Sequence, residues 1–436
     1  MTAAITARTY SIDFDAAALL SQELPLTHLF YTDHGQLNSE LADLFSFPIA
    51  HQAAMPFYLL PEPAADEMAS TLTRYYAMMV DAVRILLSSP NARIRRYFDC
   101  DMMQAHGDMF IDYARATLHS PGLAAQTLYG RFDAAVDPAS GRITGVYEFN
   151  GNTPVMLFES VNLENILATG LGHSQRQFNE WWHTTIAMLQ TRMTGGKRVA
   201  VVCDTSFIED ITTCETLVQL FEAAGCDPYL VDIRELDYDY LMPEQPFVMN
   251  QAGLRPDLIF MLTPWEEMVM TFPEAFRSHR KWFGQVSFME PAWRWFLSHK
   301  GILVFISDLY DSDPAFAARH AGLPHLRAAF EAETIGPTHV AKPALGRLSS
   351  NIRIIEQGTL TAASGGSYQD TPMIYQAYCP PGQVAGRNNF ILGAWMTSRP
   401  NSLLGDVTTL CFREFDQPVL DLRNERFIPH LLTPLD

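Results

Sequence analysis

The hydrophobic positions in the first part of the chain predict one long amphipathic helix. Between residues 64 and 87, apolar side chains recur at spacings of three and four, which is the period of one helix face. We expect this face to pack in the core rather than to bind a ligand. The stripe consists of Met68, Leu72, Tyr75, Met79, Val83 and Leu86.

The middle of the chain alternates short apolar runs with one helical segment. Val199–Cys203 is a continuous apolar run, which is typical of a strand buried on both faces. A helix is expected over 209–224, ended by Gly225, and further strands over 229–233 and 257–262. Such an alternation predicts a small parallel sheet with covering helices.

Two other patterns predict antiparallel strands. Residues 127–150 favour a hairpin whose turn is the sequence Asp-Pro-Ala-Ser-Gly at 137–141. From residue 288 onward we expect several strands, one of them in the alternating stretch 389–395, and fewer helices. The predicted fold class is therefore α/β with α+β elements.

The chain shows no internal repeat, and its texture changes twice along its length. At 436 residues it exceeds the usual size of a single core. We therefore expect three associated parts with boundaries at 1–194, 195–287 and 288–436.

The polar positions of the hairpin suggest a metal site. Because side chains alternate faces along a strand, Arg131 and Asp133 share one face, and so do Glu148 and Asn150. If these faces meet, they offer carboxylate and amide oxygens, the ligands that Mg²⁺ accepts. The alternative from spacing alone is an ordinary hairpin with a solvated polar face.

Composition and charge narrow the class of protein. Hydrophobic residues make up 48% and charged residues 18%, without a low-complexity tract, so the chain is expected to be globular. The formal net charge is −19, which opposes binding of nucleic acid. A small anionic ligand needs only a few local cations and stays compatible.

The spacing of cysteines and histidines gives no sign of a metal site, and the sequence contains no membrane-targeting or membrane-spanning pattern. The six cysteines lack paired spacing, so reduced thiols are expected, and the thirteen histidines form no metal-binding pair. The first residues do not resemble a signal peptide, and no run of about eighteen apolar residues occurs. We expect a cytoplasmic protein without membrane contact.

A loop in the last part offers a second group of candidate residues. Residues 340–351 predict a strand end followed by a loop with small and polar residues around Lys342, a composition that suits phosphate oxygens. The pattern of a Walker loop is absent. Lys300 and Arg413 are further cations of this part. For all three, the alternative is plain surface charge.

A dinucleotide-binding site in the middle part is the alternative that the strand–helix alternation suggests. Asp232 stands where a ribose-binding acid would be expected. However, the turn after the first strand, residues 204–207, has no glycine, and a pyrophosphate requires close backbone approach there. The sequence therefore disfavours a nicotinamide-dependent dehydrogenase.

Taken together and in order, these segments resemble the glutathionylspermidine synthase family of ATP-grasp ligases, in its stand-alone synthetase form without an amidase domain. The resemblance extends from about residue 45 to the C-terminus. Its motifs are Arg131-Phe132-Asp133, Glu148 to Pro154, Arg255-Pro256-Asp257 to Glu266, Glu290-Pro291-Ala292-Trp293 to Lys300, Ala341-Lys342-Pro343 to Asn351, and Ile374-Tyr375-Gln376.

The resemblance implies a permuted ATP-grasp fold with a Rossmann-like pre-ATP-grasp domain, and it implies roles for individual residues. Mg²⁺ would be held by Asp133, Glu148 and Asn150. Arg131 and Arg413 would act on the reacting groups. ATP would be bound by Lys300, Lys342, Arg347, Ser349, Asn351 and Gln376. The substrates would be met by Thr153, Glu209, Asp210 and Glu267.

Departures from the family pattern concern the substrates and the phosphate loop. Asn152 replaces the usual aspartate, and Ser349 stands where the family commonly has glycine, a change that could stiffen the loop. The residues after Asn152 differ from the serine-rich stretch that contacts glutathione. Glutathione and spermidine are therefore not inherited as substrates. Glu209 and Asp210 could receive an amine or simply complement a helix dipole.

The resemblance implies an ATP-dependent ligase that activates a carboxylate as an acyl phosphate and joins it to an amine, releasing ADP and phosphate. Its partners would be small-molecule acids and amines, and the protein could act alone or as a homodimer. The alternative is a catalytically degraded ATP-grasp protein that binds a nucleotide or peptide as an adaptor.

Overall fold

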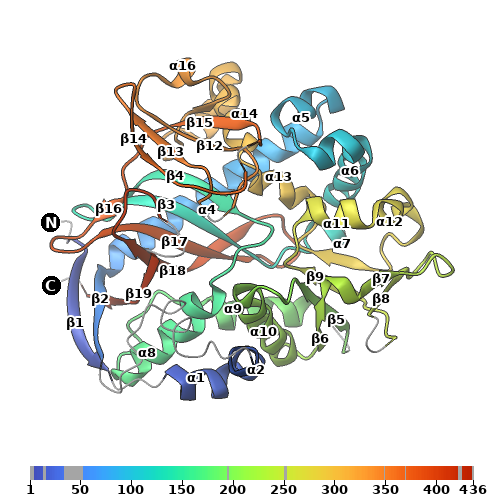
Figure 1. Ribbon diagram of the computed structural model, residues 1–436, viewed down its shortest axis with the longest axis horizontal. Helices are drawn as coiled ribbons and strands as arrows, with labels where there is room; N and C mark the ends of the chain where they lie inside the picture. The colour runs from blue at the N-terminus through green and yellow to red at the C-terminus, as the bar shows by residue number, and fades with distance from the viewer. Residues whose placement is uncertain are drawn as a thin grey trace.

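The computed structural model describes residues 4–12, 16–33, 53–193, 196–249, 253–347, 349–368, 370–420 and 425–434. It combines several sheets with helices on their faces, so the predicted mixture of α/β and α+β elements is confirmed (Figure 1). No helix among the described residues is long and apolar enough to cross a membrane.

The largest sheet joins strands from distant parts of the sequence. Its order is β19-β18-β17-β3-β4, with β16 paired to β17, so the predicted hairpin lies at one edge next to strands from the end of the chain. The strands are β3 (Tyr129–Asp137), β4 (Arg142–Asn150), β16 (Gly382–Gln383), β17 (Asn389–Ser398), β18 (Gly405–Phe415) and β19 (Glu425–Ile428).

Helices cover both faces of this sheet. The long helix α4 (Glu62–Leu87) packs on β18, β17 and β4, and every residue of its predicted stripe is buried, so this prediction is confirmed. On the other side, β18 contacts α9 and the π-helical turn η1 (Phe158–Leu163). The helices of this region are α8 (Glu164–Gly170) and α9 (Trp181–Arg192).

The predicted parallel sheet of the middle part is present. Its order is β10-β9-β5-β6 with parallel pairing throughout, and α10 packs on β5 and β6. The elements are β5 (Arg198–Cys203), α10 (Ile208–Ala223), β6 (Asp227–Asp232), β9 (Leu258–Met261) and β10 (Ser287–Met289), accompanied by the small pair β7 (Leu236–Tyr238) and β8 (Phe247–Met249).

A third sheet lies beside the hairpin and carries the predicted phosphate loop (Figure 1). Its order is β11-β15-β12-β13-β14, with antiparallel pairing. The elements are α13 (Trp295–Ser298), α14 (Gly301–Ser312), α15 (Pro314–Arg319), β11 (Ala328–Ala329), α16 (Ala332–Ile335), β12 (His339–Pro343), β13 (Arg353–Glu356), β14 (Thr359–Ala363) and β15 (Met373–Ala377).

The chain ends meet in a small sheet of order β1-β2-β20. The boundaries at 194 and 287 stay a prediction. Strands from the first and last predicted parts pair with each other in two sheets, this one and the largest sheet. The remaining elements are β1 (Thr6–Ile12), α1 (Ala16–Glu23), α2 (Pro25–Asp33), β2 (Ala53–Pro61), α5 (Asn91–Tyr97), α6 (Asp101–His119), α7 (Pro121–Ala124), α11 (Trp265–Thr271), α12 (Pro273–Arg277), β20 (His430–Thr433) and the short 3-10 helices η2 (Ile233–Glu235), η3 (His279–Lys281) and η4 (Ala292–Arg294).

Candidate active site

The register of the β3–β4 hairpin brings the four polar side chains of the predicted metal site onto one face. Arg131 lies opposite Asn150, and Asp133 lies opposite Glu148. Arg131 and Asp133 are only 6% and 7% exposed, so a merely solvated polar face is excluded for this end of the hairpin. The convergence of the faces, on which the metal hypothesis depended, is observed.

Asp133 is clamped by two arginines. Its Oδ1 accepts a hydrogen bond from Arg131 Nε at 2.8 Å, and its Oδ2 pairs with Arg413 Nη2 at 2.6 Å. Arg131 also donates to the carbonyl of Val155 at 2.7 Å and lies over the ring of Trp395. Burial alone would raise the pKa of Asp133, but the two guanidinium groups outweigh it and hold the pKa below its ordinary value.

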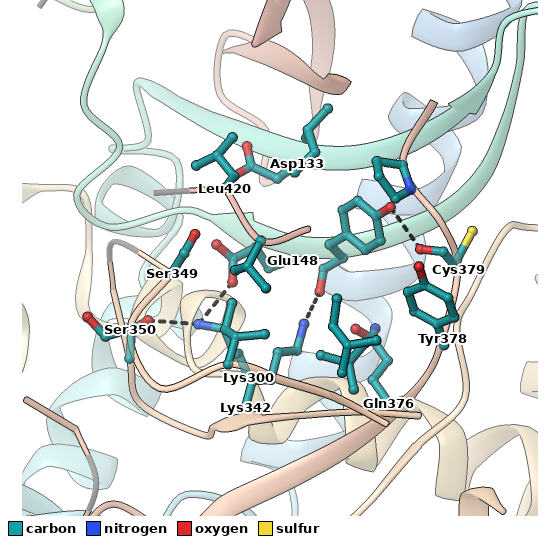
Figure 2. Close-up of a pocket in the computed structure, with 18 of the residues that line it drawn as sticks. Asp133, Glu148, Lys300, Lys342, Ser349, Ser350, Gln376, Tyr378, Cys379 and Leu420 are labelled. Atoms are coloured by element: carbon teal, nitrogen blue, oxygen red, sulfur yellow. Dashed lines mark hydrogen bonds and ion pairs between the residues drawn. The ribbon is translucent and has the colours of Figure 1, made fainter. Parts of the chain in front are cut away.

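Glu148 is met by lysines from the third sheet and its flanking helices (Figure 2). Lys300 Nζ lies 2.9 Å from Glu148 Oε2 and donates to the carbonyl of Gly346 at 2.8 Å. Lys342 Nζ donates to the carbonyl of Tyr147 at 2.8 Å. Burial works against the ionised form of Glu148, yet Lys300 and Lys342 together lower its pKa. Burial lowers the pKa of Lys342 to about 7; the charge of Glu148 opposes this shift, and the charge of Lys300 adds to it.

The structure excludes surface charge as the explanation of three basic residues. Lys300, Lys342 and Arg413 are 8%, 5% and 5% exposed. The backbone directly after Lys300 is tightly packed, because a Cβ on Gly301 would lie 1.8 Å from the Tyr97 carbonyl oxygen. Arg413 lies on β18 between two paired strands and also contacts Glu425 at 3.5 Å.

The predicted phosphate loop is tied to the parallel-sheet region. Arg347 Nη2 lies 2.5 Å from Glu266 Oε1 on α11. Ser349 and Asn351 have φ values of 51° and 57°, in the left-handed region. This conformation favours glycine, the residue that the resemblance led us to expect at position 349. Asn351 Oδ1 accepts a hydrogen bond from the Tyr368 N–H at 2.8 Å, so this side chain shapes the loop.

Two adjoining pockets share the hairpin carboxylates. Both are lined by Asp133, Glu148, Arg347, Ser349 and Leu420. The first is otherwise mostly apolar, and its polar lining includes Tyr147, Lys300, Lys342, Gln376 and Tyr378. The second has more charged and polar lining residues, which include Arg131, Asn150, Thr153, Asp204, Glu209, Asp210, Glu267, Arg413 and Glu425. Asn351 is the one predicted site residue that lines neither pocket among those described here.

The second pocket opens at the carboxyl ends of the parallel strands. Asp204 follows β5 and Leu262 follows β9, the two central strands of the sheet. The connection after β5 leads to β6 at one edge of the sheet, and the connection after β9 leads to β10 at the other edge. Such a divergence leaves a crevice between the two central strands, where α/β proteins commonly bind ligands. Glu209 and Asp210 begin α10 in this wall, and burial raises the pKa of each to about 7. Glu209 and Asp210 therefore lie both at a helix start and in a pocket wall. Binding of an amine and complementing the helix dipole both stay open as their role.

Several residues of the second pocket had no signal in the sequence. Glu425 and Leu420 reach it from the end of the chain, where no motif was identified. Outside the pocket lining, Glu159 on the π-helical turn η1 also had no signal; it is buried, and its Oε2 has no hydrogen-bond partner within the described structure. Burial, and then the charges of Glu209 and Glu425, raises its pKa to about 8.

The dinucleotide interpretation finds no support in the local contacts of Asp232. Its Oδ2 accepts a hydrogen bond from the Thr205 N–H at 3.1 Å, and its Oδ1 accepts one from the Arg234 N–H at 2.8 Å. The carboxylate therefore closes the turn after β5 and begins the short helix after β6. Both contacts are structural, and the turn after β5 contains no glycine that would let a pyrophosphate approach the backbone closely.

The oxygen ligands of the hairpin suit Mg²⁺ only if a bound phosphate supplies further oxygens. Over the described ranges, no group of three or more His, Cys, Asp or Glu residues is arranged to hold a metal ion. Asp133 and Glu148 supply two carboxylates and Asn150 an amide oxygen, which are hard donors. Mg²⁺ commonly completes such a partial set with phosphate oxygens and water.

Comparison with known proteins gives the chain a family. The family model "Glutathionylspermidine synthase preATP-grasp" matches residues 64–433. A Haemophilus influenzae protein described as "Putative acid--amine ligase" is 26% identical over 329 residues, or 70% of this chain and 75% of that protein.

Two solved structures also match. A glutathione synthetase-like effector of Globodera pallida has a TM-score of 0.49 at 10% identity, covering 96% of this chain and 98% of that one. A "Putative gamma-glutamylcysteine synthetase" of Methylobacillus flagellatus KT has a TM-score of 0.41 at 9% identity, covering 74% and 82%. The family model matches most of the length of this chain, at residues 64–433. The chain therefore belongs to the glutathionylspermidine synthase preATP-grasp family.

Proposed function

We propose that this protein is an ATP-dependent acid–amine ligase. The observation that carries the proposal is the meeting of the carboxylates Asp133 and Glu148 with the buried lysines Lys300 and Lys342, at the place where the two pockets join. Family membership and the printed description of the Haemophilus influenzae relative support it.

The first pocket suits the nucleotide. Its apolar walls accept a base, and Gln376, whose Nε2 donates to the Val146 carbonyl at 3.3 Å, lies beside them. Lys300 and Lys342 line the same pocket next to the shared carboxylates, where phosphates would lie. If bound there, Mg²⁺ would be held by Asp133 and Glu148 with Asn150, and would supply charge neutralisation during phosphoryl transfer.

In the first step of the proposed reaction, a carboxylate oxygen of the acid substrate attacks the γ-phosphorus of ATP. The bond from this phosphorus to the β–γ bridging oxygen breaks, giving an acyl phosphate and ADP. Arg131 lies in the second pocket beside the shared carboxylates, so its guanidinium can hold the substrate carboxylate or the transferring group. Fixed cations at this point stabilise the charge that develops in the transition state.

In the second step, an amine attacks the acyl carbon. The tetrahedral oxyanion collapses with loss of inorganic phosphate, the amide forms, and the amine gives up one proton. We assign stabilisation of this oxyanion to Arg413, which is buried beside Asp133. The wall with Asp204, Glu209 and Asp210 favours an amine substrate that carries positive charge.

The test is ADP release measured with pairs drawn from a panel of carboxylic acids and amines, including amines with several positive charges. We expect turnover that requires both an acid and an amine, and loss of it in Asp133→Ala and Lys342→Ala. Turnover unaffected by these changes would show the assigned roles to be wrong. MgATP binding without turnover with any pair would favour the degraded adaptor.

A further inference from the structure

The carboxylates proposed to hold Mg²⁺ are already neutralised by the protein's own cations. Both oxygens of Asp133 accept from Arg131, at 2.8 Å to Nε and 3.2 Å to Nη2, and Oδ2 also meets Arg413 at 2.6 Å. Glu148 Oε2 meets Lys300 at 2.9 Å, and its Oε1 accepts from Asn150 Nδ2 at 3.4 Å. Each of the four carboxylate oxygens therefore has a partner.

The cations proposed to hold phosphates are occupied in the same way. Lys300 is shared between Glu148 and the Gly346 carbonyl, so its ammonium joins the hairpin to the phosphate loop (Figure 2). Arg347, on that loop, pairs with Glu266. Lys342 differs, because its Nζ donates to a backbone carbonyl and not to a carboxylate.

We infer that Lys300 is a placeholder for the metal: its ammonium holds Glu148 while the nucleotide is absent and moves to the phosphates when the nucleotide enters. A metal ion arriving alone would have to displace Lys300 and then remain beside buried cations. Since like charges repel strongly where water is scarce, this state is disfavoured. A triphosphate removes the conflict, because it attracts the cations and frees the carboxylates.

The consequence is positive coupling between metal and nucleotide that acts through one named side chain. Coupling of this kind is reciprocal, so nucleotide without metal should also bind poorly, with Lys300 still held by Glu148. The inference rests on the proposed function only in taking these residues as the MgATP site. What is new is that the nucleotide-free site should bind a metal ion weakly, because Lys300 holds Glu148.

The experiment measures Mn²⁺ binding to the nucleotide-free protein by electron paramagnetic resonance, with Mn²⁺ as the probe for Mg²⁺. Lys300→Met removes the ammonium and keeps much of the side-chain length. We expect it to tighten Mn²⁺ binding about tenfold, within the usual range of such couplings. Lys342→Met is the matched control, because it removes a lysine of the same pocket that makes no bond to a carboxylate, and it should tighten binding much less.

Equal Mn²⁺ affinity in the wild type and Lys300→Met, or equal tightening by both variants, would overturn the inference. A reverse test covers the case in which Lys300→Met does not fold. Glu148→Gln releases Lys300, so a non-hydrolysable ATP analogue in the presence of a metal chelator should bind about tenfold tighter than to the wild type. Unchanged or weaker binding would also overturn it.

These outcomes are separate from those that test the ligase proposal. A protein that shows the Lys300 effect but never forms an amide would remove the proposed function and leave the inference standing. A protein that ligates acids to amines but binds Mn²⁺ equally with and without Lys300 would do the opposite.

Discussion

At the scale of single residues, the site is defined by charges that are buried and paired. Asp133 and Arg413 each have more than one opposite charge nearby, and their side chains are about one-tenth exposed or less. Removing one member of such a group leaves a buried charge without compensation, which costs more than the pair itself contributes. Substitutions here are therefore expected to affect both stability and activity.

Asp133→Asn should impair both properties. The amide keeps the size of the side chain but leaves Arg131 and Arg413 with less counter-charge, so we expect a loss of about 3 kcal/mol in the free energy of unfolding. Turnover should fall by about 10² to 10³. Chemical denaturation and ADP release measure the two effects.

Asp112→Asn is the control, because Asp112 is an exposed acid that pairs with Arg280 on the surface. Surface pairs contribute little, so the change should stay within about 0.5 kcal/mol. Normal stability and turnover in Asp133→Asn would contradict the role assigned to the buried carboxylate.

Binding of a cationic amine should depend on pH. The pKa values of Glu209 and Asp210 are both raised to about 7 by burial, so these acids are mostly protonated below that pH and mostly ionised above it. Affinity for a cationic amine should therefore increase as the pH rises from 6 to 8. Calorimetric titrations at several pH values measure it. The double variant Glu209→Gln, Asp210→Asn should flatten the profile, and an unchanged profile would show that the amine binds elsewhere.

At the scale of elements, glycines allow the close contacts that aim the site residues. Gly130 precedes Arg131 on β3, and a Cβ there would lie 2.4 Å from the Phe149 ring. Gly301 is the first residue of α14, directly after Lys300, and touches the Tyr97 carbonyl. In both cases the backbone next to a charged site residue is packed too closely for a side chain at the glycine.

Gly301→Ala should destabilise the fold, because the new methyl group would overlap backbone atoms that cannot rotate away. We expect a loss of about 3 kcal/mol in the free energy of unfolding, together with weaker nucleotide binding. Gly170→Ala, at the end of α8 with nothing within 4 Å of the added Cβ, is the control and should be neutral or stabilising by up to about 1 kcal/mol. Equal effects of the two changes would refute this account of the α14 start.

At the scale of the whole molecule, three distant segments assemble one site. The hairpin β3–β4 supplies the carboxylates, the third sheet with α14 supplies the lysines, and the parallel sheet supplies the acidic wall. Sheets shared between early and late strands hold these segments together. A ligand that bridges both pockets should therefore stabilise the entire fold.

MgATP should protect the protein against thermal unfolding, and NADH should not. At a concentration of one hundred times its dissociation constant, a ligand that binds only the folded state adds about 2.7 kcal/mol. Differential scanning fluorimetry with each compound provides the comparison. Protection by NADH alone would revive the dehydrogenase interpretation, which lacks a glycine turn after β5.

Much of the fold was predictable, because local periodicity reports burial. The α4 stripe, the strands β5, β6 and β9, and the hairpin turn were all expected from spacing and composition. Strand alternation also predicted which hairpin side chains share a face, whereas the register that sets Asp133 opposite Glu148 came from the structure. By contrast, Lys300 and Arg413 carried no local signal of burial, and Glu425 and Glu159 were missed, because their neighbours come from distant segments.

The sequence by itself determined the α/β class, the family and the set of candidate residues, since these depend on the order and spacing of side chains along one chain. Only the tertiary structure decided that Lys300 meets Glu148, that Arg413 meets Asp133, and that two pockets join at these carboxylates. The physical reason is that charge compensation acts through space, in a buried region where each ion needs an opposite partner whatever its position in the chain.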